Sequence, residues 1–225
     1  MKTIIDNLFF KVILSAVLTV SDVSAQAQPF AKEIASFKTN DSLKAPPANA
    51  ILMIGSSSFT LWKDVQDYFP HHIIINRGFG GSSFLDIIRY EADIIFPYHP
   101  KQIIIYCGEN DLTASDTVTS QLVFERFKQL FADIRNKFPK VAVAYISMKP
   151  SPARMLLMPK MSEGNMLVKA FLKKKKKTAY IDVYNKMLNE NGTPMTDIFL
   201  GDNLHLNKKG YALWQKIIEP YLLKY

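Results

Sequence analysis

The chain has 225 residues and a formal net charge of +8. This length fits one domain with a short appendage, and a hydrophobic content of 48% excludes general disorder. Cys107 is the only cysteine, which excludes an intramolecular disulfide and any cysteine-rich zinc site.

Residues 1–25 have the features of a secretory signal peptide. Lys2 provides a basic start, an apolar stretch runs from Leu8 to Val20, and small residues precede cleavage after Ala25 or Ala27. The apolar stretch is shorter than the roughly 20 residues of a membrane span, so we expect no stable span in the mature chain. No cysteine lies at the cleavage site, so a lipid anchor is not indicated. The sequence therefore predicts a secreted or periplasmic protein, with an uncleaved anchoring helix as the alternative.

The segment 26–49 is polar and ends in APPAN, which predicts a linker or a first helix before a domain over residues 50–225. Five short apolar runs follow in this domain, and they are rich in β-branched residues. They are ILMIG (51–55), IIIN (73–76), QIIIYCG (102–108), VAVAYIS (141–147) and AYIDV (179–183). Nearly continuous apolar runs of this kind are typical of parallel strands that are buried on both faces.

Helical patterns separate these runs. The clearest spans about 117–138, where apolar residues recur at helical spacing and Pro139 ends the pattern. A second helix is predicted to begin after Asn207, a good N-cap residue, and to end at Pro220. The repeated alternation of strands and helices predicts a three-layer α/β/α sandwich around a five-stranded parallel sheet.

Five consecutive lysines, Lys173 to Lys177, follow a helical stretch. Cations are favourable at a helix C-terminus and normally stay solvated there. A solvated face is the expected role, and binding to anionic lipid or polysaccharide is the alternative. We expect no nucleic-acid partner, because no basic motif with interleaved aromatic residues is present.

Polar segments follow each predicted strand at its carboxyl end. In chain order they are GSSSF, NRGFGGSS, GENDL, MKPSPAR and, after a loop, GDNLHLN. In an open α/β sheet, ligands bind beyond the carboxyl ends of the strands. A serine, a glycine-rich backbone, an asparagine and an Asp–His pair on one rim are the parts of a serine hydrolase.

Four of these segments resemble, in order, the motif blocks of the SGNH (GDSL) hydrolase family. Those blocks are Gly-x-Ser after the first strand, a glycine after the second, Gly-x-Asn-Asp after the third, and Asp-x-x-His near the C-terminus. GSSS, NRGFGGS, GEND and DNLH match them between about residues 50 and 215. The resemblance implies a flavodoxin-like SGNH hydrolase fold and a GDSL-type esterase or lipase activity.

Position by position, the resemblance implies that Ser57 is the nucleophile. Ser56 stands where the family often has an aspartate, and Ser56 or Ser58 remains the alternative nucleophile. A serine hydroxyl needs a base to become nucleophilic, and His205 is the candidate. Asp202 lies three residues before it, so its carboxylate can reach the imidazole and fix the tautomer.

The resemblance also implies three donors for an oxyanion hole. These are the backbone N–H groups of Ser57 and Gly81 and the side-chain amide of Asn110. Glycine suits the second position because it has no Cβ to block close approach. Gly78 and Gly80 remain alternatives to Gly81.

Other residues near the predicted strand ends are candidates for lesser roles. Ser56, Tyr106 and Arg154 are expected to line the substrate pocket, although Arg154 could instead pair within its own loop. Asp111 is expected to order the loop beside Asn110, and no role is assigned to Glu109. The remaining histidines, His71, His72 and His99, are expected at the opposite end as ordinary surface residues.

The predicted function is that of an exported serine esterase that forms an acyl-enzyme. The expected substrates are small carboxylic esters, such as acetyl groups on carbohydrate or short acyl chains on lipid. No metal or organic cofactor is expected, and the oligomeric state is left open. Two alternatives remain: a metal-dependent hydrolase that uses Asp202 and His205, and a catalytically silent carbohydrate- or lipid-binding module.

Overall fold

The computed structural model describes residues 28–224, so the predicted signal peptide at residues 1–25 lies outside the described residues. The described residues form one parallel sheet with the strand order β2-β1-β3-β4-β5. The strands are β1 (Ile51–Gly55), β2 (Ile74–Gly78), β3 (Gln102–Tyr106), β4 (Ala142–Ile146) and β5 (Thr178–Ile181). All five lie at the predicted apolar runs, and each end differs by at most two residues from the prediction.

The central strands are buried on both faces, as their continuous apolar sequences predicted. Every residue of β1 and β3 is buried. Successive side chains alternate between two hydrophobic cores, because side chains in a strand point to opposite faces. Leu52 and Ile103 belong to one core, whereas Met53 and Ile104 belong to the other.

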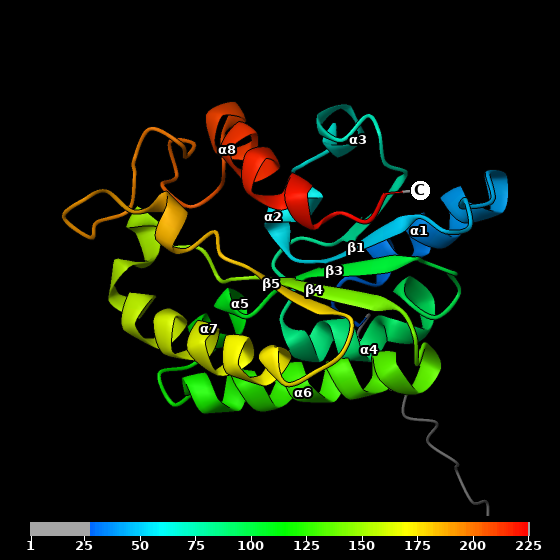
Figure 1. Ribbon diagram of the computed structural model, residues 1–225, viewed down its shortest axis with the longest axis horizontal. Helices are drawn as coiled ribbons and strands as arrows, with labels where there is room; N and C mark the ends of the chain where they lie inside the picture. The colour runs from blue at the N-terminus through cyan, green and yellow to red at the C-terminus, as the bar shows by residue number, and fades with distance from the viewer. Residues whose placement is uncertain (1–27, 225) are drawn as a thin grey trace, which may run out of the picture.

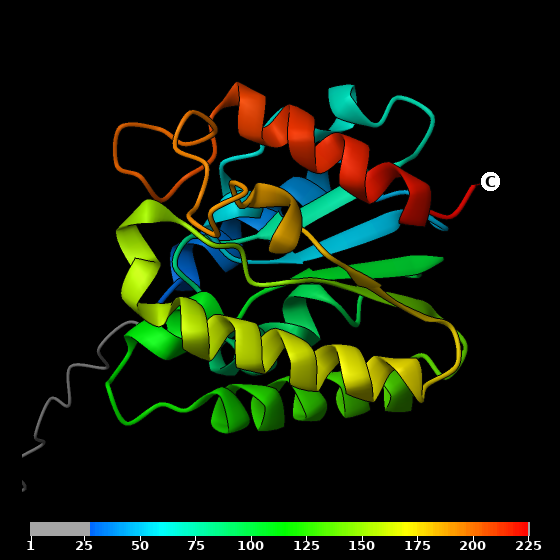
Figure 2. The same cartoon turned by 60° about the vertical axis from the view of Figure 1, so that its left-hand side comes forward.

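Helices cover both faces of the sheet, which confirms the predicted three-layer sandwich (Figures 1 and 2). One core is covered by α1 (Ala31–Leu43), α4 (Phe84–Ile94), α6 (Ser120–Lys137) and α7 (Met158–Lys173). The other is covered by α2 (Ser57–Thr60), α3 (Val65–Tyr68) and α8 (Lys208–Ile218). Short helical segments α5 (Glu109–Thr113), η1 (Pro152–Leu157), η2 (Asn185–Met187) and η3 (Glu219–Tyr221) complete the described elements.

Capping residues explain where the two predicted helices begin. The side chain of Thr119 accepts a hydrogen bond from the Leu122 N–H, so α6 begins at Ser120 rather than at residue 117. The Asn207 side chain caps α8 as predicted, accepting from the Gly210 N–H at 3.1 Å. Helix α8 ends at Ile218, and the following Pro220 lies in η3.

The polar segment 26–49 contains a helix, α1, whose Ile34 is buried in the same core as α4. Helix α7 ends at Lys173, and the lysine run 173–177 is exposed, as predicted. Within residues 28–224, no helix is both long and apolar enough to cross a bilayer.

Close packing of β1 against β3 fixes the start of the rim. Gly55, the last residue of β1, has φ of 150°, and a Cβ there would lie 2.0 Å from the carbonyl oxygen of Tyr106. Only glycine allows the chain to pass so close to a neighbouring backbone in this conformation. The chain then turns away from the sheet at Ser56 and enters α2, so Ser57 occupies the first position of that helix.

Candidate active site

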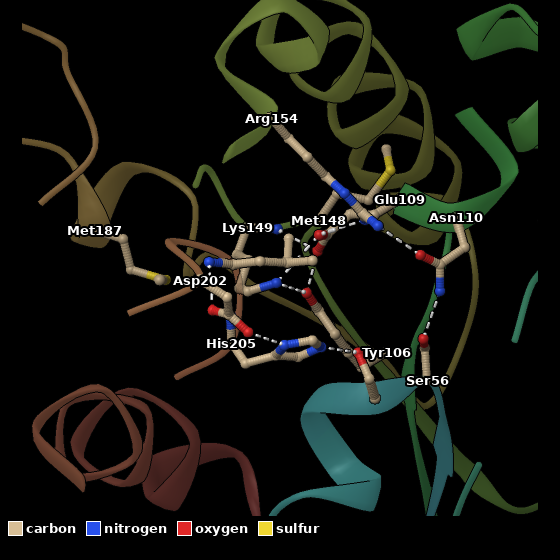
Figure 3. A network of polar contacts seen from close by, with 12 residues as sticks. Ser56, Tyr106, Glu109, Asn110, Met148, Lys149, Arg154, Met187, Asp202 and His205 are labelled. Atoms are coloured by element: carbon tan, nitrogen blue, oxygen red, sulfur yellow. Dashed lines mark hydrogen bonds and ion pairs between the residues drawn. The ribbon is translucent and has the colours of Figure 1, made fainter. Parts of the chain in front are cut away.

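The predicted site residues meet at the carboxyl end of the sheet. Ser57 follows β1, Asn110 follows β3, and Arg154 lies in η1 after β4. Asp202 and His205 lie in the turn that precedes α8. Figure 3 shows His205, Asp202, Asn110 and Arg154 within one network of polar contacts, although they come from distant parts of the chain.

Ser57, His205 and Asp202 form a hydrogen-bonded line. His205 Nε2 lies 3.1 Å from Ser57 Oγ, and His205 Nδ1 lies 2.6 Å from Asp202 Oδ2. The other carboxylate oxygen, Asp202 Oδ1, accepts the backbone N–H groups of Leu204 and His205, each at 2.9 Å. The carboxylate therefore holds both the turn and the imidazole ring.

The charge of Asp202 is fixed by these bonds. Hydrogen bonds from the His205 backbone, the His205 ring and the Leu204 backbone lower the pKa of Asp202 to about 2. An ionised Asp202 only accepts, so it favours the tautomer that carries the proton on Nδ1 of His205. In that tautomer Nε2 is the acceptor for the Ser57 hydroxyl.

The three serines after β1 have different surroundings. Ser57 Oγ lies beside the imidazole of His205, as described above. Ser56 is buried, and its hydroxyl accepts a hydrogen bond from Asn110 Nδ2 at 2.6 Å. Ser58 is also buried, with its carbonyl accepting the Tyr211 hydroxyl at 2.9 Å. Of the three hydroxyls, the one that faces the imidazole belongs to Ser57.

Two of the three candidate glycines border the site. Gly80 and Gly81 line a hollow of about 680 Å³ together with Ser57 and His205. By contrast, the Gly78 N–H donates to Asn76 Oδ1 at 2.9 Å. A Cβ at Gly78 would also lie 2.5 Å from Phe59 Cβ, so this glycine serves the packing of α2 against β2.

The side chain of Asn110 is held on both sides. Its Nδ2 donates to Ser56 Oγ and, at 3.0 Å, to the Ser82 carbonyl oxygen. Its Oδ1 accepts from Arg154 Nη2 at 2.8 Å. The amide is therefore fixed with its N–H groups toward the Ser56 side of the rim.

The sequence interpretation missed a buried charged cluster beneath this rim. Glu109 Oε2 accepts from Lys149 Nζ at 3.1 Å and from Arg154 Nη1 at 3.2 Å, and Glu109 Oε1 contacts the Tyr106 hydroxyl. Burial raises the pKa of Glu109, but the charges of Lys149 and Arg154 outweigh burial and lower it overall. Lys149 lies three residues after the end of β4, in the polar segment at the rim, and this position could have marked it as a rim residue.

Two predicted lining residues take part in this cluster. Tyr106 and Arg154 line a second hollow beside Ser56 and Ser57, which has room for little more than one water molecule. Burial and the neighbouring Glu109 carboxylate raise the pKa of Tyr106 well above its ordinary value, so the phenol stays protonated. Arg154 pairs with groups outside its own loop.

Asp111 orders the loop beside Asn110, as predicted. Its Oδ1 accepts from Arg126 Nη1 at 2.8 Å, and its Oδ2 accepts the Phe84 N–H at 3.0 Å. The carboxylate thus joins α5 to the start of α4 and to the second turn of α6.

One of the other histidines is not a surface residue. The side chain of His72 is only 4% exposed, and its Nε2 lies 3.1 Å from Glu219 Oε1. The prediction was wrong because the turn before β2 is covered by the C-terminal segment, which sequence spacing does not show.

Among residues 28–224, no three His, Cys, Asp or Glu side chains are grouped so that they could hold a metal ion.

Comparisons with known proteins identify the family to which the chain belongs. Residues 54–213 match the model of the GDSL-like lipase/acylhydrolase family. The chain therefore belongs to the GDSL-like lipase/acylhydrolase family and is an ester hydrolase of this type. A search of curated proteins finds no significant match.

Solved structures share the fold at low sequence identity. A protein from Streptococcus pneumonia has a TM-score of 0.73 and 18% identity, over 85% of this chain and 92% of its own. A GDSL-like lipase from Bacteroides thetaiotaomicron has a TM-score of 0.69 and 18% identity, over 84% and 96%. An acetyl-xylooligosaccharide esterase from Geobacillus has a TM-score of 0.61 and 12% identity, over 77% and 94%.

Proposed function

We propose that the protein hydrolyses carboxylic esters through an acyl-enzyme on Ser57. The Ser57 oxygen attacks the ester carbonyl carbon while its proton passes to His205 Nε2. The same proton then goes to the leaving alcohol as its bond to the acyl carbon breaks. Water releases the acid from Ser57 in the reverse sense, with His205 again as base and then as acid. Asp202 holds the ring and stabilises the imidazolium.

The negative charge that develops on the carbonyl oxygen needs donors that already face it. The proposed donors are the N–H groups of Ser57 and Gly81 and the side-chain amide of Asn110. Gly81 and Asn110 line the same hollow as Ser57, which supports this assignment, and on substrate binding the Asn110 N–H that donates to Ser56 Oγ would be shared with the carbonyl oxygen. Removing one such donor typically lowers turnover by roughly 100- to 1000-fold.

The observation that carries the proposal is the hydrogen-bonded line from Ser57 through His205 to Asp202, at 3.1 and 2.6 Å. A silent binding module would have no need of an imidazole placed between a helix-terminal hydroxyl and an ionised carboxylate. The metal-dependent alternative has less support, since Asp202 and His205 lie together without a third His, Cys, Asp or Glu ligand among the described residues.

The proposed substrates are esters with a short acyl group, such as acetyl esters of carbohydrate or short-chain esters of lipid. Support comes from the open hollow that Ser57 and His205 line, because the smaller hollow beside Ser56 has room for little more than a water molecule and so offers no tunnel for a long acyl chain. The fold shared with an acetyl-xylooligosaccharide esterase is a second, weaker support. Export from the cytoplasm, proposed from residues 1–25, would bring the enzyme to polymeric or membrane-bound esters.

Single-alanine variants of the three serines test the proposal with a nitrophenyl acetate substrate. Ser57→Ala should lower kcat by about 1000-fold or more, whereas Ser58→Ala should retain a folded protein and an intact Ser57–His205 pair. Ser56→Ala should lower kcat less than Ser57→Ala, because it removes a partner of Asn110 and not the nucleophile. Full activity in Ser57→Ala, or loss of wild-type activity on adding a chelator, would overturn the assignment.

A further inference from the structure

We propose that Arg154 is a positioning residue that holds the side-chain amide of Asn110 in the orientation needed for oxyanion stabilisation. Glu109 and Lys149 are the buried anchor that holds Arg154 itself. This inference rests on the proposed function, because it assigns a partner to one of the proposed oxyanion donors. It gives Arg154 a role other than binding substrate.

The direction of the hydrogen bonds carries the first step. A guanidinium group has only donors, so Arg154 Nη2 can bond to Asn110 only through the amide oxygen, at 2.8 Å. That contact turns the Asn110 NH₂ group to the opposite side, where Ser56 Oγ and the Ser82 carbonyl oxygen accept from it. The arginine and the Ser82 carbonyl oxygen, which can only accept, therefore favour the same flip state of the amide, and the arginine holds its oxygen end.

The second step concerns what fixes Arg154. Its other terminal nitrogen, Nη1, donates to Glu109 Oε2 at 3.2 Å, and the Arg154 side chain is 15% exposed. Glu109 in turn accepts from the backbone N–H and from Nζ of Lys149, each at 3.1 Å. The side chains of Glu109 and Lys149 are only 7% and 3% exposed, so the anchor is held by charge-assisted bonds with little access of water (Figure 3).

The backbone around Arg154 extends this link to the base. The N–H of the preceding Ala153 donates to the carbonyl oxygen of Asn203 at 3.1 Å. Asn203 belongs to the turn that carries Asp202 and His205. The η1 segment thus contacts the proposed oxyanion donor through a side chain and the turn of the base through its backbone.

The kinetic consequence follows from the need for donors that are oriented before the reaction starts. Arg154→Met removes the guanidinium and retains a long apolar stem. We expect kcat to fall by about 10- to 100-fold, less than the loss expected for the missing donor itself, while KM changes by less than about twofold. Arg154→Lys should recover part of kcat, because one ammonium can donate to Asn110 but cannot reproduce the planar fork.

A double-mutant cycle with Asn110→Ala separates positioning from other roles. If Arg154 acts through Asn110, Arg154→Met should lower kcat strongly in the wild-type background and by less than about twofold in the Asn110→Ala background. Arg89→Met is the matched control, since Arg89 is an exposed arginine in α4 that pairs with Asp86. It should leave kcat and KM unchanged.

Each other outcome overturns the inference. Equal losses of kcat in both backgrounds, or a rise in KM that persists without Asn110, would make Arg154 a substrate-binding residue. The role of Arg154 would be structural if two results held together. The loss of kcat in Arg154→Met would have to match a loss of folded protein, and Arg154→Lys would have to be folded and as active as the wild type. Ser57→Ala is measured alongside to distinguish the two proposals. Full activity of Ser57→Ala would contradict the proposed function. Additive losses in the double-mutant cycle would contradict only the role of Arg154.

Discussion

His205 Nε2 lies 3.1 Å from Ser57 Oγ, although 148 residues separate the two in the chain. The parallel sheet produces this contact, because β1 ends at the same rim as the other strands and α8 packs across the same face as α2. The turn before α8 is then held in place by Asp202, which accepts two backbone N–H groups of that turn. Sheet topology and one local turn together create the proposed catalytic line.

Asp202→Asn should lower activity while preserving the turn. The amide oxygen can still accept the two backbone N–H groups, which directs the NH₂ group toward His205 Nδ1. A donor there favours the tautomer that carries its proton on Nε2, which cannot accept the Ser57 proton. We expect kcat to fall by about 100- to 10,000-fold with a small change in thermal stability. Asp197→Asn, an exposed change, should keep wild-type kcat. An Asp202→Asn enzyme as active as the wild type would contradict the proposed role of Asp202 in orienting His205.

The pH dependence of activity should not report the ionisation of Asp202. The pKa of Asp202 is lowered to about 2, so its stabilising contribution is complete above about pH 4 and is lost as the pH falls toward 2. Above that range Asp202 stays ionised, and any acid-side loss of kcat must come from another group. We expect kcat to decline in mild acid, because the proposed mechanism needs a base that can accept the Ser57 proton; a pH series at constant ionic strength measures this. A flat profile down to pH 4 would argue against a histidine base.

Lys149→Met should destabilise the fold. Glu109 would keep a buried charge and lose one of its two cationic partners, which we expect to lower the free energy of unfolding by about 2–4 kcal/mol. Urea unfolding of this variant should be compared with that of Lys209→Met, which breaks an exposed pair and should change the free energy by less than about 0.5 kcal/mol. Adding Glu109→Gln to Lys149→Met should restore part of the stability. Equal stability of the two lysine variants would show that the buried pair contributes nothing.

Gly55→Ala should be among the most damaging single substitutions in the sheet. Its Cβ would lie 2.0 Å from the Tyr106 carbonyl oxygen in a backbone conformation that disfavours alanine, so β1 and β3 would have to separate. We expect a loss of at least about 2 kcal/mol in the free energy of unfolding. Gly201→Ala is the control, because no atom beyond the adjoining residues lies within 4 Å of the added Cβ. Similar melting temperatures for the two variants would show that the close approach is unimportant.

The sheet could be predicted because β-branched runs mark buried parallel strands, and the rim could be predicted because polar segments follow those strands. The short sequence motifs then placed Ser57, Asn110, Asp202 and His205 at one edge. Sequence could not show the pairing of Glu109 with Lys149 and Arg154, because these residues lie on three segments whose distances depend on tertiary packing. It also could not show the burial of His72, which is set by the packing of the C-terminal segment.

The most direct test of the account is to trap the acyl-enzyme. The protein would be mixed with nitrophenyl acetate, quenched in acid within the first turnovers, digested, and analysed by fragmentation mass spectrometry of the peptide that contains Ser56, Ser57 and Ser58. We predict one acetyl group on Ser57 in the wild type and none on this peptide in Ser57→Ala. An acetyl group on Ser56 or Ser58 in the wild type, or continued turnover by Ser57→Ala without any adduct, would contradict the central claim.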